Sequence, residues 1–189
     1  LNNVRFVFSG SQRHVLENMF VSANRPFFQS TQIMNLGCID EAAYYEFAHK
    51  KLKQNGQILT TTAFNHLYSS LFGHTWYVQM ILNRLFETAQ KNITEEFIDA
   101  TIANVIAENE ATYQTFVRLI TPTQRKLLRA VASEGTAKEI TGKNFVGKYQ
   151  LGAISTIRLS TKTLVEKELL LDQNSHYEVY DRFFGIWLK

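Results

Sequence analysis

The end of the chain carries its most restrictive pattern, a series of short helical segments followed by two β-runs. A boundary at Thr121-Pro122 opens the pattern, because proline suits the first turn of a helix and not its interior. Apolar spacing and turn residues then predict helices at 124–133, 144–149 and 154–168. They also predict the two strands of a hairpin, at 169–171 and 177–180. Three helices and a hairpin in this order are the winged variant of the helix-turn-helix, which we expect over residues 120–189.

The middle of the chain, residues 38–119, is expected to form a helical bundle. Each predicted helix opens on a capping residue or just after a glycine, and its apolar residues recur with helical spacing. Asn55-Gly56 and Gly73 are typical helix ends. The predicted starts are Asp40, Thr61 or Thr62, Trp76 and Thr94. The pattern therefore favours a compact bundle of about four helices.

The first segment, residues 1–37, has a different pattern. Val4 to Phe8 is a β-run that ends in the turn Ser9-Gly10-Ser11, and helical spacing continues from Gln12 to Val21. Thr31 to Leu36 offers a second short strand. A lone strand is unstable, so we expect its partner strands in a preceding part of a longer protein. The segment is interpreted as the tail of an α/β domain.

Composition narrows the class further. The chain has 189 residues, of which 45% are hydrophobic and 13% aromatic, enough for a core and for two small domains. Its single cysteine, Cys38, excludes an intrachain disulfide and is expected in the core. No apolar run approaches the roughly 20 residues that span a bilayer, so we expect a cytoplasmic protein with no membrane contact. The expected fold class is mainly α.

Charge is distributed unevenly. From Thr121 to Lys189 there are 11 Lys and Arg residues against 7 Asp and Glu, whereas the preceding 120 residues hold 9 against 10. The basic excess of the chain therefore lies in the predicted winged helix. The five histidines are scattered without metal-ligand spacing, and we predict no metal site.

Four segments carry a further signal by their order along the chain: Phe6 to Arg13, Arg25 to Thr31, Gly73 to Gln79 and Tyr180 to Leu188. Together they resemble the archaeal-type ATPases, a branch of the STAND division of AAA+ proteins. The resemblance implies that residues 1–37 are the C-terminal remnant of the α/β nucleotide-binding domain. It also implies that residues 38–119 are a helical lid, followed by the winged helix.

In that family the phosphate loop and the Mg²⁺-binding acidic strand lie in an upstream ATPase domain. This chain contains no G-x-x-x-x-G-K-[ST] motif, so it has no loop lysine or backbone cradle for phosphates. The resemblance therefore implies ATP and Mg²⁺ in the full-length parent, no cofactor in this chain, and the missing N-terminal ATPase domain as a partner. Any hydrolysis belongs to the longer protein.

Candidate nucleotide contacts in the first segment are two serines and two arginines. Ser9 and Ser11 follow a predicted strand, where open α/β sheets place ligand-facing groups. The resemblance makes this the sensor position for the γ-phosphate, while Ser11 is equally suited to capping the next helix. Arg13 and Arg25 can neutralise phosphate charge through their planar, permanently charged guanidinium groups. The alternative for both arginines is a solvated surface.

The resemblance also places Gly73-His74-Thr75 where STAND proteins keep a Gly-x-Pro at the start of a lid helix. That motif packs the adenine and senses the phosphates, and threonine here replaces the proline. Glycine permits close backbone approach, and a helix N-terminus favours anions. The alternative is a simple helix break between two bundle helices.

The predicted helix 154–168 presents a candidate recognition surface. Helical periodicity turns one set of residues to the core and another outward. The core set is Ile154, Ile157, Thr161, Leu164 and Val165, and the outward set is Ser155, Thr156, Arg158, Leu159 and Lys162. Serine, threonine, arginine and lysine suit phosphate and base-edge contacts, and Lys143 and Lys148 on the preceding helix support them.

Two functions of different classes follow. The first is the regulatory part of an ATP-dependent switch, whose lid closes on nucleotide and whose winged helix relays the state. In that case the winged helix packs on the nucleotide domain or on a protein partner. The second is a DNA-binding winged-helix transcriptional regulator, whose partner is double-stranded DNA. A protein-interaction module is a third option, and in none of them is the chain itself catalytic.

Overall fold

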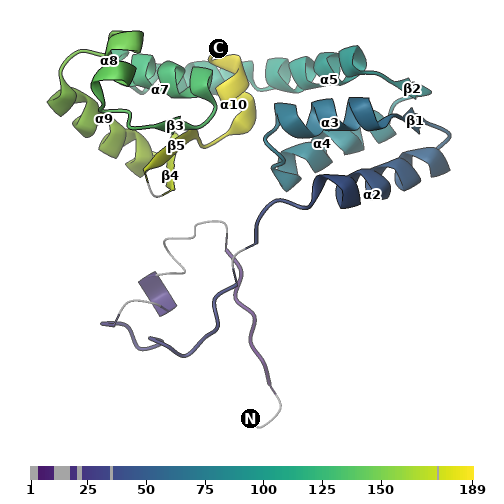
Figure 1. The fold of residues 1–189 in the computed structure, drawn as a ribbon, viewed down its shortest axis with the longest axis horizontal. Coiled ribbons are helices and arrows are strands. Elements are labelled where there is room, and N and C mark those ends of the chain that lie inside the picture. Colours follow the sequence, from purple (N-terminus) through teal and green to yellow (C-terminus); the bar gives the residue numbers. More distant parts are fainter. Residues whose placement is uncertain (1–3, 11–17, 21–22, 35, 174) are drawn as a thin grey trace. The chain divides into compact units, whose positions relative to one another are not determined.

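The fold was taken from a computed structural model, which describes residues 4–10, 18–20, 23–34, 36–173 and 175–189. The chain divides into two compact units, Leu1–Gly37 and Cys38–Lys189. Within the second unit, helices dominate and the C-terminal part is a winged helix. The colours of Figure 1 follow the chain through both units.

The first unit does not show the two predicted strands. The described residues 4–10 and 31–34 have no regular secondary structure, whereas residues 18–20 are helical. A strand needs a neighbour to pair its N–H and C=O groups, and the described residues of this unit supply none. An aromatic cluster organises it instead, with the buried Phe20 ring 5.3 Å from Phe8 and 6.1 Å from Phe27.

Residues 38–119 contain the helices that the sequence predicts and one more. The side chains of Asp40 and Thr94 accept hydrogen bonds from first-turn amides, so these two caps are as expected. The helix predicted to open at Thr61 or Thr62 begins at Thr61 and is capped by Thr60. The additional helix, α6 (Glu110–Arg118), is separated from α5 (Glu95–Glu108) by Asn109 alone. The helices are α2 (Glu41–Gln54), α3 (Thr61–Ser70), α4 (Thr75–Phe86), α5 (Glu95–Glu108) and α6 (Glu110–Arg118).

Two short strands close the far end of the bundle. β1 (Ile58–Leu59) and β2 (Asn92–Ile93) pair in parallel, with Ile58 opposite Asn92 and Leu59 opposite Ile93. Leu59 and Ile93 are both buried, so the pair joins the core that the helices enclose. These two-residue strands are too short for a sequence pattern and were not predicted.

The winged helix follows the predicted order. Its helices are α7 (Pro122–Glu134), α8 (Lys143–Tyr149) and α9 (Ile154–Glu166), and Thr121 forms a capping box with Gln124 at the start of α7. The wing consists of β4 (Leu170–Gln173) and β5 (His176–Val179), which pair antiparallel. A strand that was not predicted, β3 (Ala137–Lys138), pairs with β5 and gives the sheet order β3-β5-β4.

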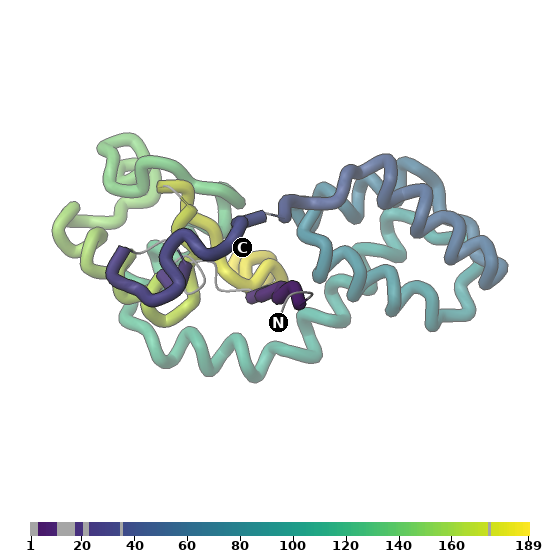
Figure 2. Tube along the Cα trace, turned by 90° about the horizontal axis from the view of Figure 1, so that it is seen from below, coloured from purple at the N-terminus to yellow at the C-terminus, as the bar shows by residue number. Residues whose placement is uncertain are grey.

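The last helix, α10 (Arg182–Trp187), joins the winged helix to the bundle. Phe183 and Phe184 are buried, so the apolar end of the chain is part of the core. The Phe183 ring meets Tyr77 of α4 edge to face at 5.0 Å, and the Phe184 ring stacks on Tyr113 of α6 at 5.2 Å. One hydrophobic cluster therefore runs from the bundle into the winged helix, and the chain passes between them through α5 and α6 (Figure 2).

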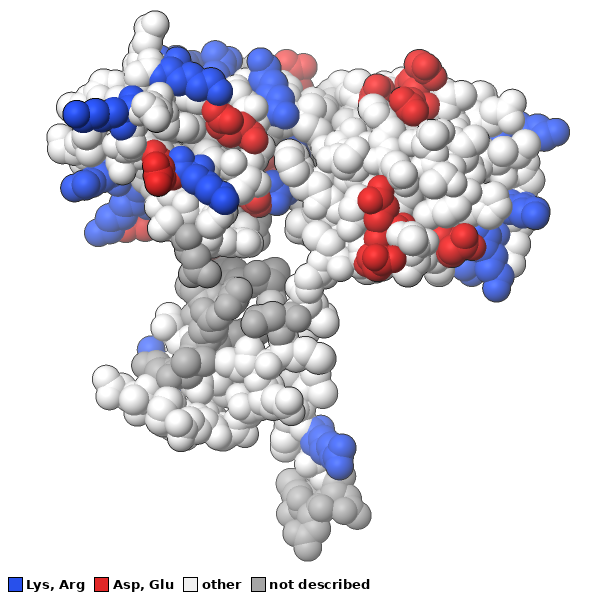
Figure 3. Space-filling view, in the orientation of Figure 1, with Lys and Arg blue, Asp and Glu red and all other residues white. Residues whose placement is uncertain are grey.

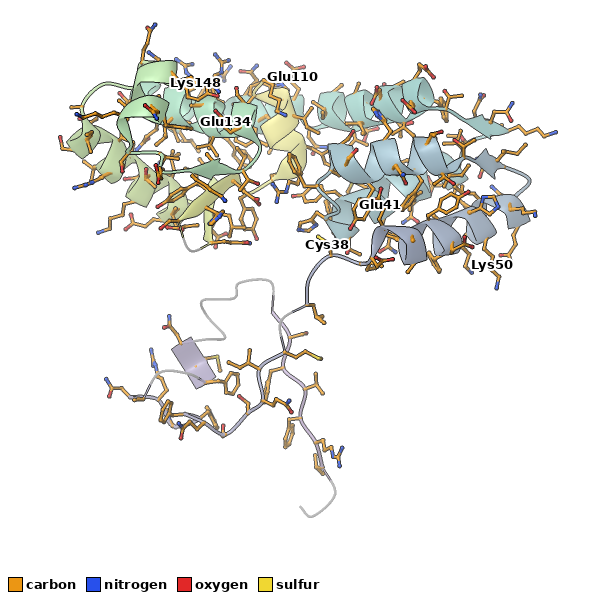
Figure 4. The ribbon with its side chains drawn as sticks, in the orientation of Figure 1. Cys38, Glu41, Lys50, Glu110, Glu134 and Lys148 are labelled. Atoms are coloured by element: carbon orange, nitrogen blue, oxygen red, sulfur yellow. The ribbon has the colours of Figure 1, made fainter. Side chains whose placement is uncertain are left out.

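Two burial predictions were wrong. Cys38 is exposed, because the chain runs over the surface just before α2 (Figure 4). The Cys38 Sγ donates a hydrogen bond to the Phe72 carbonyl at 3.7 Å. Ile154 is 40% exposed, since it is the first residue of α9. Ile157, Thr161 and Leu164 are buried as predicted, and Val165 is half-buried.

Candidate functional site

The turn between α3 and α4 is tightly constrained at Gly73. This residue is buried and has φ +66°, a left-handed conformation that favours glycine, and its N–H donates to the Tyr68 carbonyl at 2.8 Å. A Cβ on Gly73 would lie 2.6 Å from the Tyr68 ring, whose hydroxyl is fixed on the Ile39 carbonyl at 2.7 Å. The geometry alone therefore requires glycine at this helix break.

The start of α4 lacks a side-chain cap. His74 is the N-cap residue but makes no side-chain hydrogen bond to the first-turn amides, and the same is true at the starts of α6, α8 and α9. Burial, and then the positive charge of Arg182, lower the pKa of His74. The Thr75 carbonyl accepts a hydrogen bond from the Tyr44 hydroxyl at 3.3 Å, which ties the turn to α2. The first turn of α4 thus keeps the positive end of its dipole without a side-chain acceptor.

The same turn contacts the winged helix. The Phe72 ring covers Gly135, the C-cap of α7, where an added Cβ would come within 2.7 Å of the ring. The guanidinium of Arg182, at the start of α10, lies 5.0 Å from the centre of the Phe72 ring. Arg182 also pairs with Glu178 of β5. Sequence patterns assign none of these residues to a site, because they meet only through the tertiary fold.

The predicted outward face of α9 is confirmed by its exposure. Ser155, Thr156, Arg158 and Lys162 are all exposed, and so is Leu159, at 67%. The Lys162 ammonium lies 3.9 Å from the Glu166 carboxylate, a surface pair that costs little to break. Lysine and arginine side chains gather over the winged helix in the space-filling view (Figure 3).

The two lysines of α8 differ. Lys143 is exposed, whereas Lys148 donates to the Glu134 carboxylate of α7 at 2.7 Å, and the Tyr149 hydroxyl donates to the same oxygen at 2.8 Å (Figure 4). The hydrogen bond from Lys148, and then that from Tyr149, lowers the pKa of Glu134, while Glu134 raises the pKa of Lys148. Lys148 is therefore part of an ion pair and is a weaker candidate for phosphate contact than Lys143.

A groove of about 700 Å³ lies between α9 and the sheet. Its basic side chains include Lys138, Arg158 and Lys162, and its acidic ones include Glu139 and Glu166. The predicted recognition residues thus border a hollow of mixed charge. A second hollow of about 480 Å³ near the start of α8 brings Lys143 and Lys148 close to Lys138.

The predicted residues of the first unit are only partly described. Ser9 and Arg25 are exposed, and the Arg25 carbonyl accepts a hydrogen bond from the Phe28 amide at 3.1 Å in a turn. Ser11 and Arg13 lie outside the described residues. The role of these four residues in nucleotide binding stays a prediction.

In the described part of the chain, no three His, Cys, Asp or Glu side chains are placed to share a metal ion. Among the described helices, none combines the length and the apolar character that a membrane crossing requires.

Comparison with known proteins identifies the C-terminal part. A family model described as a probable winged helix domain matches residues 111–189. This part of the chain is a winged helix domain. The match begins inside α6, before the boundary predicted at 120, in agreement with the packing of Tyr113 on Phe184. Searches of curated proteins and of solved structures give no match, and the resemblance to the archaeal-type ATPases stays a prediction.

Proposed function

We propose that this chain is the C-terminal regulatory part of an ATP-binding switch of the STAND class of AAA+ proteins. Residues 38–119 form the lid that closes on nucleotide held by a preceding ATPase domain, and the winged helix relays the closure. The chain has no phosphate loop, so in this proposal it senses nucleotide and does not hydrolyse it alone.

One observation carries the proposal. The turn that contains Gly73-His74-Thr75, the segment that resembles the nucleotide-sensing motif, also packs against the winged helix through Phe72. A change at this turn would therefore reach both parts of the second unit. Such a contact is what a relay between a lid and a winged helix requires.

The residues at this turn are compatible with a bound phosphate. The first-turn amides of α4 receive no side-chain cap, and helix N-termini favour anions. In this proposal Gly73 and Thr75 would approach the phosphates. ATP supplies the charged phosphates, and Mg²⁺ would be bound by the preceding domain.

The test is ATP binding by the longer protein that contains this chain. In the Thr75→Glu variant, a carboxylate at the start of α4 satisfies the helix dipole but repels phosphate, so the fold is kept. We expect the Kd for ATP to rise about tenfold, equal to about 1.4 kcal/mol. Gln79→Glu, exposed one turn further along α4, is the matched control. Equal ATP affinity in the two variants would count against the lid role.

A second candidate, a DNA-binding transcriptional regulator, is favoured by the exposure of Ser155, Thr156, Arg158 and Lys162 on α9. Side chains of this kind bind phosphates and base edges, and Lys143 lies on the adjacent helix. An exposed Leu159 among them equally suits a protein partner.

Titration with duplex DNA at two salt concentrations separates these two kinds of partner. If α9 binds DNA, neutralising Arg158→Gln and Lys162→Gln together should weaken binding and reduce the salt slope by about one for each phosphate that is no longer neutralised. Lys50→Gln with Lys53→Gln, on α2, is the control of equal charge change. Absence of duplex binding at low salt would leave a protein surface as the partner of α9.

A further inference from the structure

Phe72 has an unusual backbone for its residue type. Its φ is +54°, a conformation that a bulky side chain adopts only when its surroundings enforce it. The ring is 44% exposed, so burial alone does not account for its position. What holds the ring is a pair of contacts with the winged helix, at Gly135 and at Arg182.

The Gly135 contact requires the absence of a side chain. Gly135 has φ +74° and ends α7, the first helix of the winged helix. Because a Cβ there would lie 2.7 Å from the Phe72 ring, glycine lets the aromatic ring rest directly on the main chain. The ring therefore follows the α7 backbone without a flexible side chain between them.

An ion pair with Glu178 of β5 holds the Arg182 guanidinium in place against the Phe72 ring. Arg182 and Glu178 are ion-paired and expose only 13% and 16% of their side chains. Glu178 also accepts a hydrogen bond from the Thr136 hydroxyl at 2.5 Å, next to Gly135. A guanidinium fixed by a mostly buried pair is a rigid partner for an aromatic face. Phe72 is thus seated against α7 and α10 by one connected set of contacts.

We propose that Phe72 is the positioning residue through which the turn Gly73-His74-Thr75 sets the position of the winged helix. This inference rests on the proposed nucleotide-sensing role of that turn. Phe72 is bonded directly to Gly73, so a shift of the turn moves its ring. Since the ring rests on Gly135 and Arg182, the shift passes to α7 and α10, and through these two helices to the rest of the winged helix.

The first experiment measures amide hydrogen exchange in the longer protein with and without ATP. Phe72→Asn removes the ring and keeps a residue that tolerates positive φ. Phe86→Asn removes a ring of the same 44% exposure that is remote from these contacts. We expect both variants to bind ATP, but the ATP-dependent change in α9 exchange should fall at least about fivefold in Phe72→Asn alone.

The outcomes separate the inference from the proposed function. If the unaltered protein does not bind ATP, the proposed function fails. If Phe72→Asn binds ATP and its α9 response equals that of Phe86→Asn, the inference fails and the proposed function stands. Arg182→Lys keeps the charge and loses the planar guanidinium, and it should reduce the α9 response in the same direction.

A second measurement needs no nucleotide. In the 189-residue chain, Phe72→Asn should speed amide exchange at the end of α7 and in α10 by about fivefold or more over Phe86→Asn. Exchange in α2 should be the same in both variants. Equal exchange in α7 and α10 of the two variants would show that the ring does not link the bundle to the winged helix, and would overturn the inference.

Discussion

The side-chain amide of Gln57 donates a hydrogen bond to the carbonyl of Leu85 at 2.7 Å, across the end of the bundle. The same nitrogen reaches the Gln90 carbonyl at 3.1 Å, and Gln57 is only 3% exposed. One buried amide therefore fixes the loop before β1 to the end of α4 and to the segment that leads into β2.

Replacing Gln57 with methionine should destabilise the chain. Methionine keeps the length of the side chain but donates no hydrogen bond, so the Gln90 carbonyl loses this partner. We expect the free energy of unfolding to fall by about 1–2 kcal/mol, measured by urea denaturation. Gln79→Met, at an exposed site on α4, should change it little. Equal losses in the two variants would refute the role of the buried amide.

Two glycines of the winged helix should respond to alanine in opposite directions. At Gly135, alanine must take a left-handed backbone and displace the Phe72 ring, which should cost about 1–2 kcal/mol. Gly147 lies inside α8, and apart from the backbone of its own helix and its chain neighbours no atom lies within 4 Å of the Cβ position, so alanine there should stabilise the chain by about 0.5–1 kcal/mol. Thermal unfolding checks both, and a stabilising Gly135→Ala would contradict the contact with Phe72.

The sequence predicts features that depend on neighbours along the chain. The caps at Asp40 and Thr94 form as expected, because each is satisfied within one helical turn. The exposure of Arg158 and Lys162 also follows from local periodicity. Helix α6 was missed because Asn109 alone separates it from α5, a break too short for a sequence signal.

Features that depend on distant neighbours could not be predicted. Strand β3 has two residues, and only its pairing with β5 defines it. The ion pair between Lys148 and Glu134 joins α8 to α7, so the outward position of Lys148 did not reveal its partner. The contacts of Phe72 with Gly135 and Arg182 likewise bring three separate elements together. Such arrangements arise from packing, which carries no local pattern.

Stability should fall as the pH drops below the ordinary pKa of histidine, in part because of His74. Burial, and then Arg182, lower the pKa of His74 in the folded chain, so the unfolded chain binds the proton first. The contribution of neutral His74 to the free energy of unfolding is therefore complete above about pH 6.5. It is lost as the pH falls from there through the pKa of His74 in the folded chain.

The His74→Gln variant tests this contribution. Urea unfolding midpoints measured from pH 7.5 to 5 should fall less steeply in His74→Gln than in the unaltered chain. Arg182→Gln should reduce the slope by a smaller amount, because burial is the larger cause of the shift. Identical slopes in the unaltered chain and His74→Gln would mean that His74 titrates alike in both states.

Replacing Tyr113 tests whether α6 belongs to the winged helix, as the match over residues 111–189 indicates. Tyr113 is 3% exposed, and its ring lies 5.2 Å from Phe184 and 5.8 Å from Trp187. Tyr113→Ala should therefore leave a cavity beside α10 and cost about 3–5 kcal/mol of unfolding free energy. Tyr180→Ala, at a site 41% exposed, should cost less than about 1 kcal/mol. Amide exchange locates the effect of the substitution. If α6 belongs to the winged helix, α10 should lose protection from exchange in Tyr113→Ala. Intact protection of α10 would assign α6 to the bundle alone.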